Sequence, residues 1–246
     1  MNPAFIKKCI AHRALCRTGL VENSYGAIKE CAAKSIPIEV DLQFHPGGEI
    51  YVFHDESLDR MFKYKINLCD CPVENLGLLK YSDGSRILTL SELLEVVDGE
   101  VLILIELKAA KSLSFKNKKR FCELLLVHLN QYAGDVYIQS FNPIILNILR
   151  KMKTKFPLGA LVCDWNKVGG LNILERKFLQ SQVSLLINKV DFISMDADLI
   201  STKTFSTLSY LKLKPIFLWT IKSNYQKFLQ KRGVTKIIAE NFYENN

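Results

Sequence analysis

The chain has 246 residues, of which 48% are hydrophobic, and a formal net charge of +8 at pH 7. This length suits one or two domains, and α/β barrels of this size commonly form a single one. No run of about 18 uncharged apolar residues occurs, so we expect no membrane span, and the charges between Lys7 and Arg17 argue against a secretory signal.

Short apolar runs alternate with helix-length segments along the whole chain. The runs are continuously apolar, which is typical of strands buried on both faces in a parallel sheet covered by helices. The predicted strands are Cys9–His12, Ile38–Leu42, Val101–Leu107, Val136–Phe141, Leu158–Cys163, Phe192–Asp196, Ile216–Ile221 and Lys236–Ala239. One predicted helix runs from a cap at Asn23 or Ser24 to Lys34. The others are Phe121–Leu129, Ile144–Met152, Leu171–Leu186, Thr202–Leu211 and Tyr225–Lys231.

This alternation predicts an α/β fold, and with this number of strands a (β/α)8 TIM barrel. We expect residues 1–246 to form a single domain. The structural alternative is a doubly wound open sheet, because the number of strands does not by itself show that the sheet closes.

One spacing departs from the alternation. We interpret residues 44–89 as a long insertion after the second strand. The turn Pro46-Gly47-Gly48 and the short run Ile50–Phe53 predict a small hairpin that delivers His54. Thr89–Val97 has the apolar spacing of an amphipathic helix that returns the chain to the barrel. Long excursions of this kind are more often functional than not.

Two carboxylates lie two residues apart inside the second predicted strand. Side chains at i and i+2 of a strand point to the same face. Glu39 and Asp41 therefore converge, and their repulsion is costly unless a cation or a proton compensates it. Glu106 and Lys108 end the third predicted strand, and His12-Arg13 ends the first. Because barrels place their sites at the carboxyl ends of the strands, we expect these groups to share one sector of the rim.

Glu39, Asp41 and Glu106 form an all-oxygen set. Hard cations such as Mg²⁺ or Ca²⁺ suit this set better than zinc, which prefers histidine and cysteine. The alternative is that each acid pairs with a neighbouring lysine or arginine. Three acids at strand ends favour one bound divalent cation.

The remaining groups suit a phosphate ester. Arg13 and Lys108 would hold the non-bridging oxygens, arginine through its planar fork and lysine as a point charge. His12 and His54 can divide the proton transfers, since histidine titrates near neutral pH. One would activate the nucleophile and the other would protonate the departing alcohol. Asp55 either orients His54 or caps the turn.

The seven cysteines lack the spacing of a disulfide framework. We therefore expect reduced thiols and a cytoplasmic location, with Cys69 and Cys71 as ordinary thiols rather than zinc ligands. The basic cluster of Lys111 and Lys116–Arg120 is interpreted as the solvated start of a helix. Aromatic residues do not alternate with these charges, so we expect no nucleic-acid partner.

These motifs together resemble those of the glycerophosphodiester phosphodiesterase family. Its opening His-Arg-Gly and Pro-Glu-Asn-Thr or Ser correspond here to His12-Arg13-Ala14 and Val21-Glu22-Asn23-Ser24. Further matches are Ile38-Glu39-Val40-Asp41-Leu42, Val52-Phe53-His54-Asp55, Leu58-Asp59-Arg60, Glu106-Leu107-Lys108, Ser140-Phe141 and Trp219-Thr220. The family's closing Ile-Thr-Asp-x-Pro appears as Ile238-Ala239-Glu240-Asn241-Phe242. Because Ala14 replaces a glycine, the backbone there must avoid positive φ or bear strain.

The resemblance implies a TIM barrel that hydrolyses glycerophosphodiesters to sn-glycerol 3-phosphate and an alcohol, with one divalent cation, Mg²⁺ or Ca²⁺. The implied acid–base pair is His12 and His54. The implied metal ligands are Glu39, Asp41 and Glu106. The implied substrate-binding residues are Arg13 and Lys108 for the phosphate, and Phe141 and Trp219 for the glycerol or alcohol group. From the sequence alone, Trp219 could equally belong to the barrel core. The expected partner is the small-molecule substrate.

Two alternative functions are weighed against this one. A metal-independent, phospholipase C-like phosphodiesterase also pairs histidines on a barrel, but it would leave the three acids without a cation. A non-catalytic phosphate-ester-binding protein could use the same scaffold, but such a protein has usually lost an acid, a base or a ligand. None of these is missing here, so we expect an enzyme.

Overall fold

The computed structural model describes residues 8–15, 19–109, 113–166, 190–202 and 214–240. The strands in these ranges are β1 (Cys9–Ala11), β2 (Ile38–His45), β3 (Glu49–Val52), β4 (Ile103–Lys108), β5 (Val136–Ser140), β6 (Leu158–Val162), β7 (Phe192–Asp196), β8 (Ile216–Ile221) and β9 (Val234–Ala239). The helices are α2 (Tyr25–Ala33), α3 (Asp59–Phe62), α4 (Val73–Leu78), α5 (Leu90–Val97), α6 (Phe115–Gln131), α7 (Pro143–Lys151) and α10 (Tyr225–Leu229). Two 3-10 helices are η1 (Leu68–Asp70) and η2 (Ala197–Ser201).

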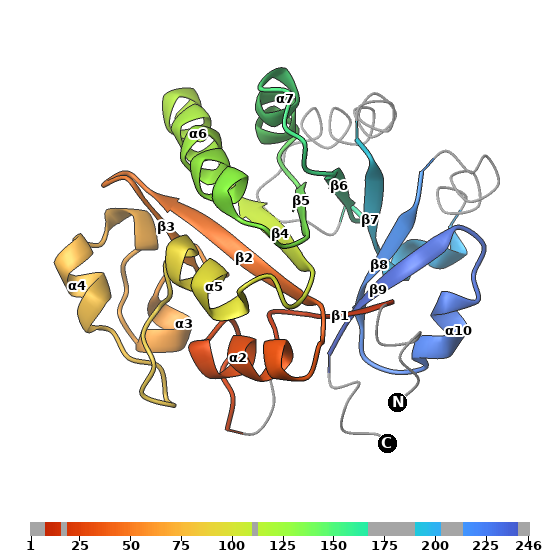
Figure 1. Cartoon of the computed structure of the whole chain (residues 1–246), viewed down its shortest axis with the longest axis horizontal. Helices are drawn as coiled ribbons and strands as arrows, with labels where there is room; N and C mark the ends of the chain where they lie inside the picture. Colours follow the sequence, from red (N-terminus) through yellow and green to blue (C-terminus); the bar gives the residue numbers. More distant parts are fainter. Residues whose placement is uncertain (1–7, 16–18, 110–112, 167–189, 203–213, 241–246) are drawn as a thin grey trace.

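The strands close into a barrel (Figure 1). β1 pairs in parallel with β9 on one side and with β2 on the other. Parallel pairing continues from β2 through β4, β5, β6, β7 and β8 to β9. An open sheet would leave two of these strands with one parallel neighbour each, so the doubly wound alternative is wrong. The predicted TIM barrel is confirmed.

The barrel wall separates two apolar layers, because alternate residues of a strand face opposite sides. Ile38, Val40 and Leu42 of β2 belong to the large buried cluster that the strands share with α2, α5, α6 and α7. A second buried cluster lies inside the barrel and consists of Ile10, Leu104, Phe192, Phe217 and Ile238. The site groups follow this inner cluster along the same face of each strand, so it forms the floor beneath them.

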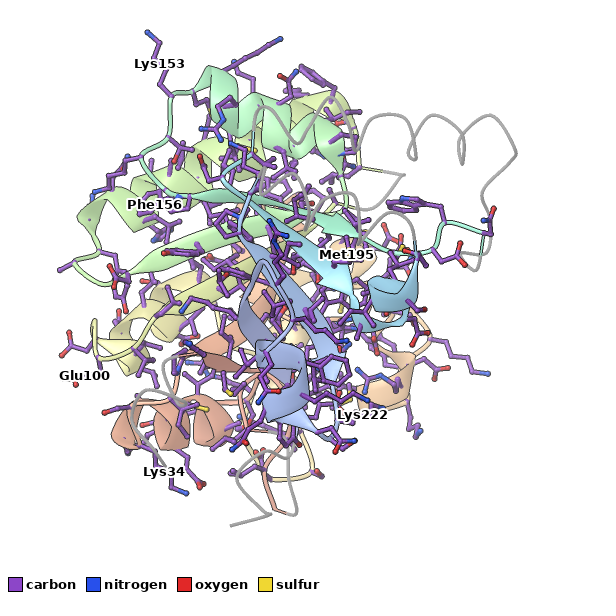
Figure 2. All side chains as sticks on the ribbon, turned by 90° about the vertical axis from the view of Figure 1, so that its right-hand side faces the viewer. Lys34, Glu100, Lys153, Phe156, Met195 and Lys222 are labelled. Carbon is purple, nitrogen blue, oxygen red and sulfur yellow. The ribbon has the colours of Figure 1, made fainter. Side chains whose placement is uncertain are left out.

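The helices cover the outside of the barrel. α2 lies beside α5, and α6 beside α7 (Figure 1). Figure 2 shows Lys34, Glu100 and Lys153 pointing outward from the periphery, whereas Met195 is enclosed. Among the described residues, no helix combines the length and the hydropathy that a bilayer crossing requires. The predicted helix over Leu171–Leu186, and the one over Thr202–Leu211 beyond its first residue, lie outside the described ranges.

Helix α6 begins earlier than predicted. Ser114 caps it by accepting a hydrogen bond from the Asn117 amide at 3.2 Å, so the helix starts at Phe115 rather than Phe121. The basic run is thus the first part of this helix, but its interpretation as solvated is only partly correct. Lys118 is buried and its ammonium group donates to the Leu113 carbonyl. Lys111 lies outside the described residues.

The insertion after β2 packs onto the barrel. The expected hairpin is present, but its first strand is the end of β2, which continues to His45 and pairs antiparallel with β3. His45 holds the turn that follows, since its Nδ1 accepts from the Gly47 amide at 3.0 Å and its Nε2 donates to the Cys71 carbonyl at 2.9 Å. The insertion then encloses a small core of its own, made of Tyr51, Phe53, Leu58, Leu68, Cys71, Leu76, Tyr81 and Ile87.

The helix that ends the insertion has a complete capping box. Thr89 accepts a hydrogen bond from the Glu92 amide at 3.3 Å, while the Glu92 carboxylate accepts from the Thr89 amide at 2.9 Å. Replacing Thr89 with alanine should lower the free energy of unfolding by about 1 kcal/mol, measured by urea denaturation. Ser91→Ala in the same helix is the control and should cause no comparable loss. Equal losses in the two variants would contradict a capping role.

Candidate active site

A cavity of about 130 Å³ lies at the carboxyl ends of the strands. It is lined by His12, Arg13, Glu39, His54, Glu106, Lys108, Gln139, Phe141, Leu161, Trp219, Thr220 and Ile238. Every residue predicted for the site is therefore on its wall except Asp41, which is buried just beneath it in contact with Lys108. Tertiary structure thus brings the predicted groups together at one place.

Strand register positions the three acids. The parallel pairing of β2 with β4 places Asp41 opposite Glu106, and the pairing of β4 with β5 places Glu106 opposite Gln139. Glu39 lies two residues before Asp41 and faces the same side. Carboxylate oxygens of Glu39, Asp41 and Glu106 all lie within 4.8 Å of one another, and all three side chains are buried. We refer to these three residues as the acid triad.

Asp41 is the member of the triad that the protein keeps ionised. Burial opposes its charge, but the Lys108 ammonium lies 3.1 Å from its Oδ1, and Asn23 donates to its Oδ2 at 2.9 Å. The Arg13 Nε lies 3.6 Å from the same Oδ2. Together with the charge of His54, these groups hold the pKa of Asp41 well below its usual range.

The pKa values of Glu39 and Glu106 are shifted in the opposite direction from that of Asp41. Burial and the Asp41 charge raise the pKa of both carboxyls. The Lys108 Nζ lies 2.7 Å from Glu106 Oε1. Glu39 accepts a hydrogen bond from the Arg13 backbone amide at 3.0 Å. Lys108 and Arg13 supply two positive charges against three carboxylates, so the fully ionised triad has excess negative charge.

The triad fits a hard divalent cation. Oxygens bound to Ca²⁺ on opposite sides of the ion are separated by roughly 5 Å at most, since Ca–O distances are about 2.3–2.6 Å. The triad's oxygens lie within 4.8 Å of one another, and the donor set contains no sulfur or nitrogen. The alternative, in which each acid pairs with a basic residue, is only partly realised, through Lys108 and Arg13.

His54 follows β3, where the Phe53 amide donates to the Asp41 carbonyl at 2.9 Å. Its Nδ1 lies 2.6 Å from Asp55 Oδ1, so Asp55 orients this histidine, one of the two roles considered for it. Burial disfavours the imidazolium, and Lys108 adds to this effect. The pKa of His54 is therefore lowered even though Asp41 and Asp55 oppose the shift.

Two arginines connect the site to the insertion. Arg60 donates to the second oxygen of Asp55 and lies 2.5 Å from Glu22 Oε1. The same Glu22 oxygen accepts from Arg13 at 3.0 Å. Arg60, Glu22 and Asp55 therefore form one charged network that fixes both His54 and Arg13.

The backbone at the end of β1 is held in an unusual conformation. Arg13 has φ 52° and Ala14 has φ 61°, so the alanine in place of the family's glycine does adopt a left-handed conformation. The strain is of the order of 1–2 kcal/mol for such a residue. Two hydrogen bonds offset it, from the Arg13 amide to the Glu39 carboxylate and from the Ala14 amide to the Glu39 carbonyl at 3.1 Å.

Aromatic rings form the apolar side of the cavity. Phe141 packs edge-to-face against Trp219, with ring centroids 5.6 Å apart, and against Trp165 at 5.8 Å. Trp219 lines the cavity, so it is not simply a core residue, the other possibility left by the sequence. Trp165 was not predicted, because a tryptophan after a strand carries no signal for the site on its own.

Several polar residues of the site escaped prediction as functional groups. They are Glu22, Asn23, Arg60, Gln139 and Glu240. All of these except Gln139 lie inside the motifs Glu22-Asn23, Leu58-Asp59-Arg60 and Ile238-Ala239-Glu240. The motifs therefore pointed to these residues but did not say what they do. Gln139 is buried and its amide oxygen has no partner among the described residues. Its position opposite Glu106 could be found only from the strand register.

Fold and site together define a class of protein, a TIM barrel with a buried acid triad, two histidines and two cationic side chains around one cavity. Comparison with known families then gives a specific assignment. The chain belongs to the glycerophosphoryl diester phosphodiesterase family, whose sequence pattern matches residues 12–242.

Individual relatives agree with this assignment. A glycerophosphodiester phosphodiesterase of Caldanaerobacter subterraneus subsp. tengcongensis is 29% identical over 161 residues, which cover 62% of this chain and 65% of that protein, less than two thirds of its length. An Oleispira antarctica phosphodiesterase, solved in complex with the product sn-glycerol-3-phosphate, has a TM-score of 0.77 at 18% identity and covers 96% of this chain and 94% of its own. A glycerophosphodiester phosphodiesterase of Parabacteroides distasonis has a TM-score of 0.73 at 17% identity, with coverages of 94% and 92%. Because the two solved structures are less than 25% identical to this chain, they show that the fold is shared and no more.

Proposed function

We propose that the protein hydrolyses glycerophosphodiesters to sn-glycerol 3-phosphate and an alcohol, with a divalent cation and two histidines. One observation carries the proposal: His12 and His54, each with a carboxylate on Nδ1, line the same cavity as Glu39 and Glu106 of the acid triad, on the fold of this family. The carboxylates are those of Glu240 for His12 and Asp55 for His54. The product named for the Oleispira antarctica structure supports the substrate class.

Substrate binding follows from the walls of the cavity. Arg13 and Lys108 present cationic groups to the phosphate, and hydrogen bonds to the surrounding carboxylates hold both in place. Phe141 and Trp219 offer apolar faces to the carbon skeleton of the glycerol or alcohol group. The acid triad is the set that would hold Mg²⁺ or Ca²⁺, and a bound dication would neutralise phosphoryl charge that otherwise repels a nucleophile.

The two histidines divide the proton transfers. The pKa of His54 is lowered, so its neutral form can accept the proton of the attacking hydroxyl, from water or from the substrate's own 2-hydroxyl. His12 has a raised pKa and remains protonated at higher pH, so it gives its proton to the departing alcohol oxygen. The new oxygen–phosphorus bond forms as the bond to the alcohol breaks, and the proton taken by one histidine balances the proton lost by the other. When the 2-hydroxyl attacks, this step gives a cyclic phosphate, which water then opens to sn-glycerol 3-phosphate with the two histidines in exchanged roles.

The experiment that tests this function uses the purified full-length chain with Mg²⁺ or Ca²⁺. Release of sn-glycerol 3-phosphate is measured for glycerophosphocholine, glycerophosphoethanolamine and glycerophosphoinositol, and release of lysophosphatidate is measured for lysophospholipids. We expect turnover of at least one glycerophosphodiester. Calorimetric binding of these compounds without product release, for every substrate and both cations, would instead favour the non-catalytic phosphate-ester-binding protein.

A cytoplasmic location is part of the proposal. The cysteines in the described residues, Cys9, Cys31, Cys69, Cys71, Cys122 and Cys163, are all free thiols, including the close pair 69 and 71. Persistent thiols are typical of a reducing compartment, which supports this location. Fractionation of cells that carry the tagged protein would test it.

A further inference from the structure

The last described residue of the chain contacts the first predicted catalytic residue. Glu240 Oε1 lies 3.0 Å from His12 Nδ1, although 228 positions separate the two in the sequence. No role for Glu240 follows from the predicted site, and it does not line the cavity with the substrate-facing groups. The contact therefore needs its own explanation.

Strand register explains why these two residues meet. The pairing of β1 with β9 places Ile10 opposite Ile238, and both belong to the cluster inside the barrel. Two residues further along, His12 and Glu240 face the same side as those isoleucines. The His12 amide donates to the Ala239 carbonyl at 3.0 Å, which extends the ladder to this point. The contact is thus a consequence of barrel closure.

The Glu240 backbone is fixed independently of its side chain. Its amide donates to the Ile221 carbonyl at 3.0 Å, and the Tyr225 hydroxyl lies 2.8 Å from its carbonyl oxygen. A carboxylate on a fixed backbone holds its partner imidazole in one orientation. Lys222, labelled in Figure 2, lies 3.7 Å from the other Glu240 oxygen, but its side chain is 76% exposed.

We propose that Glu240 is a positioning residue for His12, which binds the Nδ1–H and so directs Nε2 with its proton toward the cavity. This inference rests on the proposed function, in which His12 protonates the departing alcohol. Asp55 does the same for His54 from the next position in the chain. Each catalytic imidazole therefore has its own carboxylate, one from a local turn and one from the closing strand.

The charges around His12 agree with this role. Burial is the largest single effect and disfavours the imidazolium, and the Arg13 charge adds to it. The hydrogen bond to Glu240 and the charges of Glu39 and Asp41 together outweigh these two effects. The pKa of His12 is therefore raised. The hydrogen bond to His12 lowers the pKa of Glu240 itself, so Glu240 is ionised at neutral pH.

The test compares Glu240→Gln with Lys222→Gln by nitrogen NMR of the histidine side chains, in the full-length protein with Mg²⁺. The His12→Asn spectrum assigns the signals of His12. In Glu240→Gln we expect the pKa of His12 to fall and its Nδ1–H tautomer to lose population, whereas Lys222→Gln should leave both almost unchanged. The measurement needs no turnover, so it stands even if the proposed activity is absent.

Turnover gives the second readout. Glu240→Gln should lower kcat about 10- to 100-fold, the size expected when a group that orients another is removed, with little change in KM. The alkaline limb of its pH profile should move to lower pH, whereas Asp55→Asn should move the acidic limb instead. Glu240→Asp keeps the charge and should retain more activity than Glu240→Gln. An unchanged His12 pKa and tautomer in a folded Glu240→Gln protein would overturn the proposal, as would equal effects of Lys222→Gln.

Discussion

Replacing His12 or His54 with alanine is expected to reduce turnover of glycerophosphodiesters by about 100- to 10,000-fold in each case, the usual contribution of a positioned acid or base. Both side chains line the cavity, and each has a carboxylate on Nδ1 that leaves Nε2 for the substrate. Steady-state kinetics with a glycerophosphodiester is the measurement. His128→Ala is the matched control, because His128 lies in α6, does not line the cavity, and its loss should leave turnover almost unchanged.

The same assignment predicts the shape of the pH profile. A base must be neutral, so activity falls as the pH drops through the pKa of His54, which is lowered from 6.5. An acid must be protonated, so activity falls as the pH rises through the pKa of His12, which is raised from 6.5. The profile of kcat/KM should therefore be bell-shaped, with its maximum between the pKa of His54 and the pKa of His12. Near-normal turnover in His12→Ala or His54→Ala would contradict the acid–base assignment.

Removing the divalent cation should abolish turnover almost completely. A bound dication is worth several kcal/mol of charge stabilisation at a phosphoryl group, which corresponds to about a 1,000-fold change or more. Without it, the substrate anion meets three buried carboxylates that are opposed mainly by Lys108 and Arg13. Dialysis against EDTA should remove activity, and added Mg²⁺ or Ca²⁺ should restore it. Activity that survives exhaustive chelation would favour the metal-independent, phospholipase C-like alternative.

Calorimetry tests the same site without turnover. Because burial and Asp41 raise the pKa of Glu39 and Glu106, these carboxyls hold protons more readily than free glutamates. Cation binding requires their ionised forms, so it should release protons. The apparent enthalpy of binding should then depend on the ionisation enthalpy of the buffer. Glu106→Gln should weaken cation binding and turnover together, whereas Glu123→Gln, in an exposed ion pair on α6, should affect neither.

The strands and the acid triad could be predicted because their signals are local. Each strand is a short apolar run, and alternation of side chains along β2 is enough to bring Glu39 and Asp41 to one face. The carboxyl ends of parallel strands meet on one rim, so Glu106 could be added without knowing the register. Helix α6 was predicted too short, because its first turns are polar and carry no apolar stripe.

Contacts between distant residues could not be predicted in the same way. The sequence determined which groups are available: the motifs that resemble those of the family, two histidines, three acids and two cationic side chains. Tertiary structure alone decided that Arg60 and Glu22 connect His54 to Arg13, that Lys108 lies between two acids, and that Glu240 reaches His12. The physical reason is barrel closure. Pairing β1 with β9 fixes a register between the two ends of the chain, and no local pattern of hydrophobicity encodes that register.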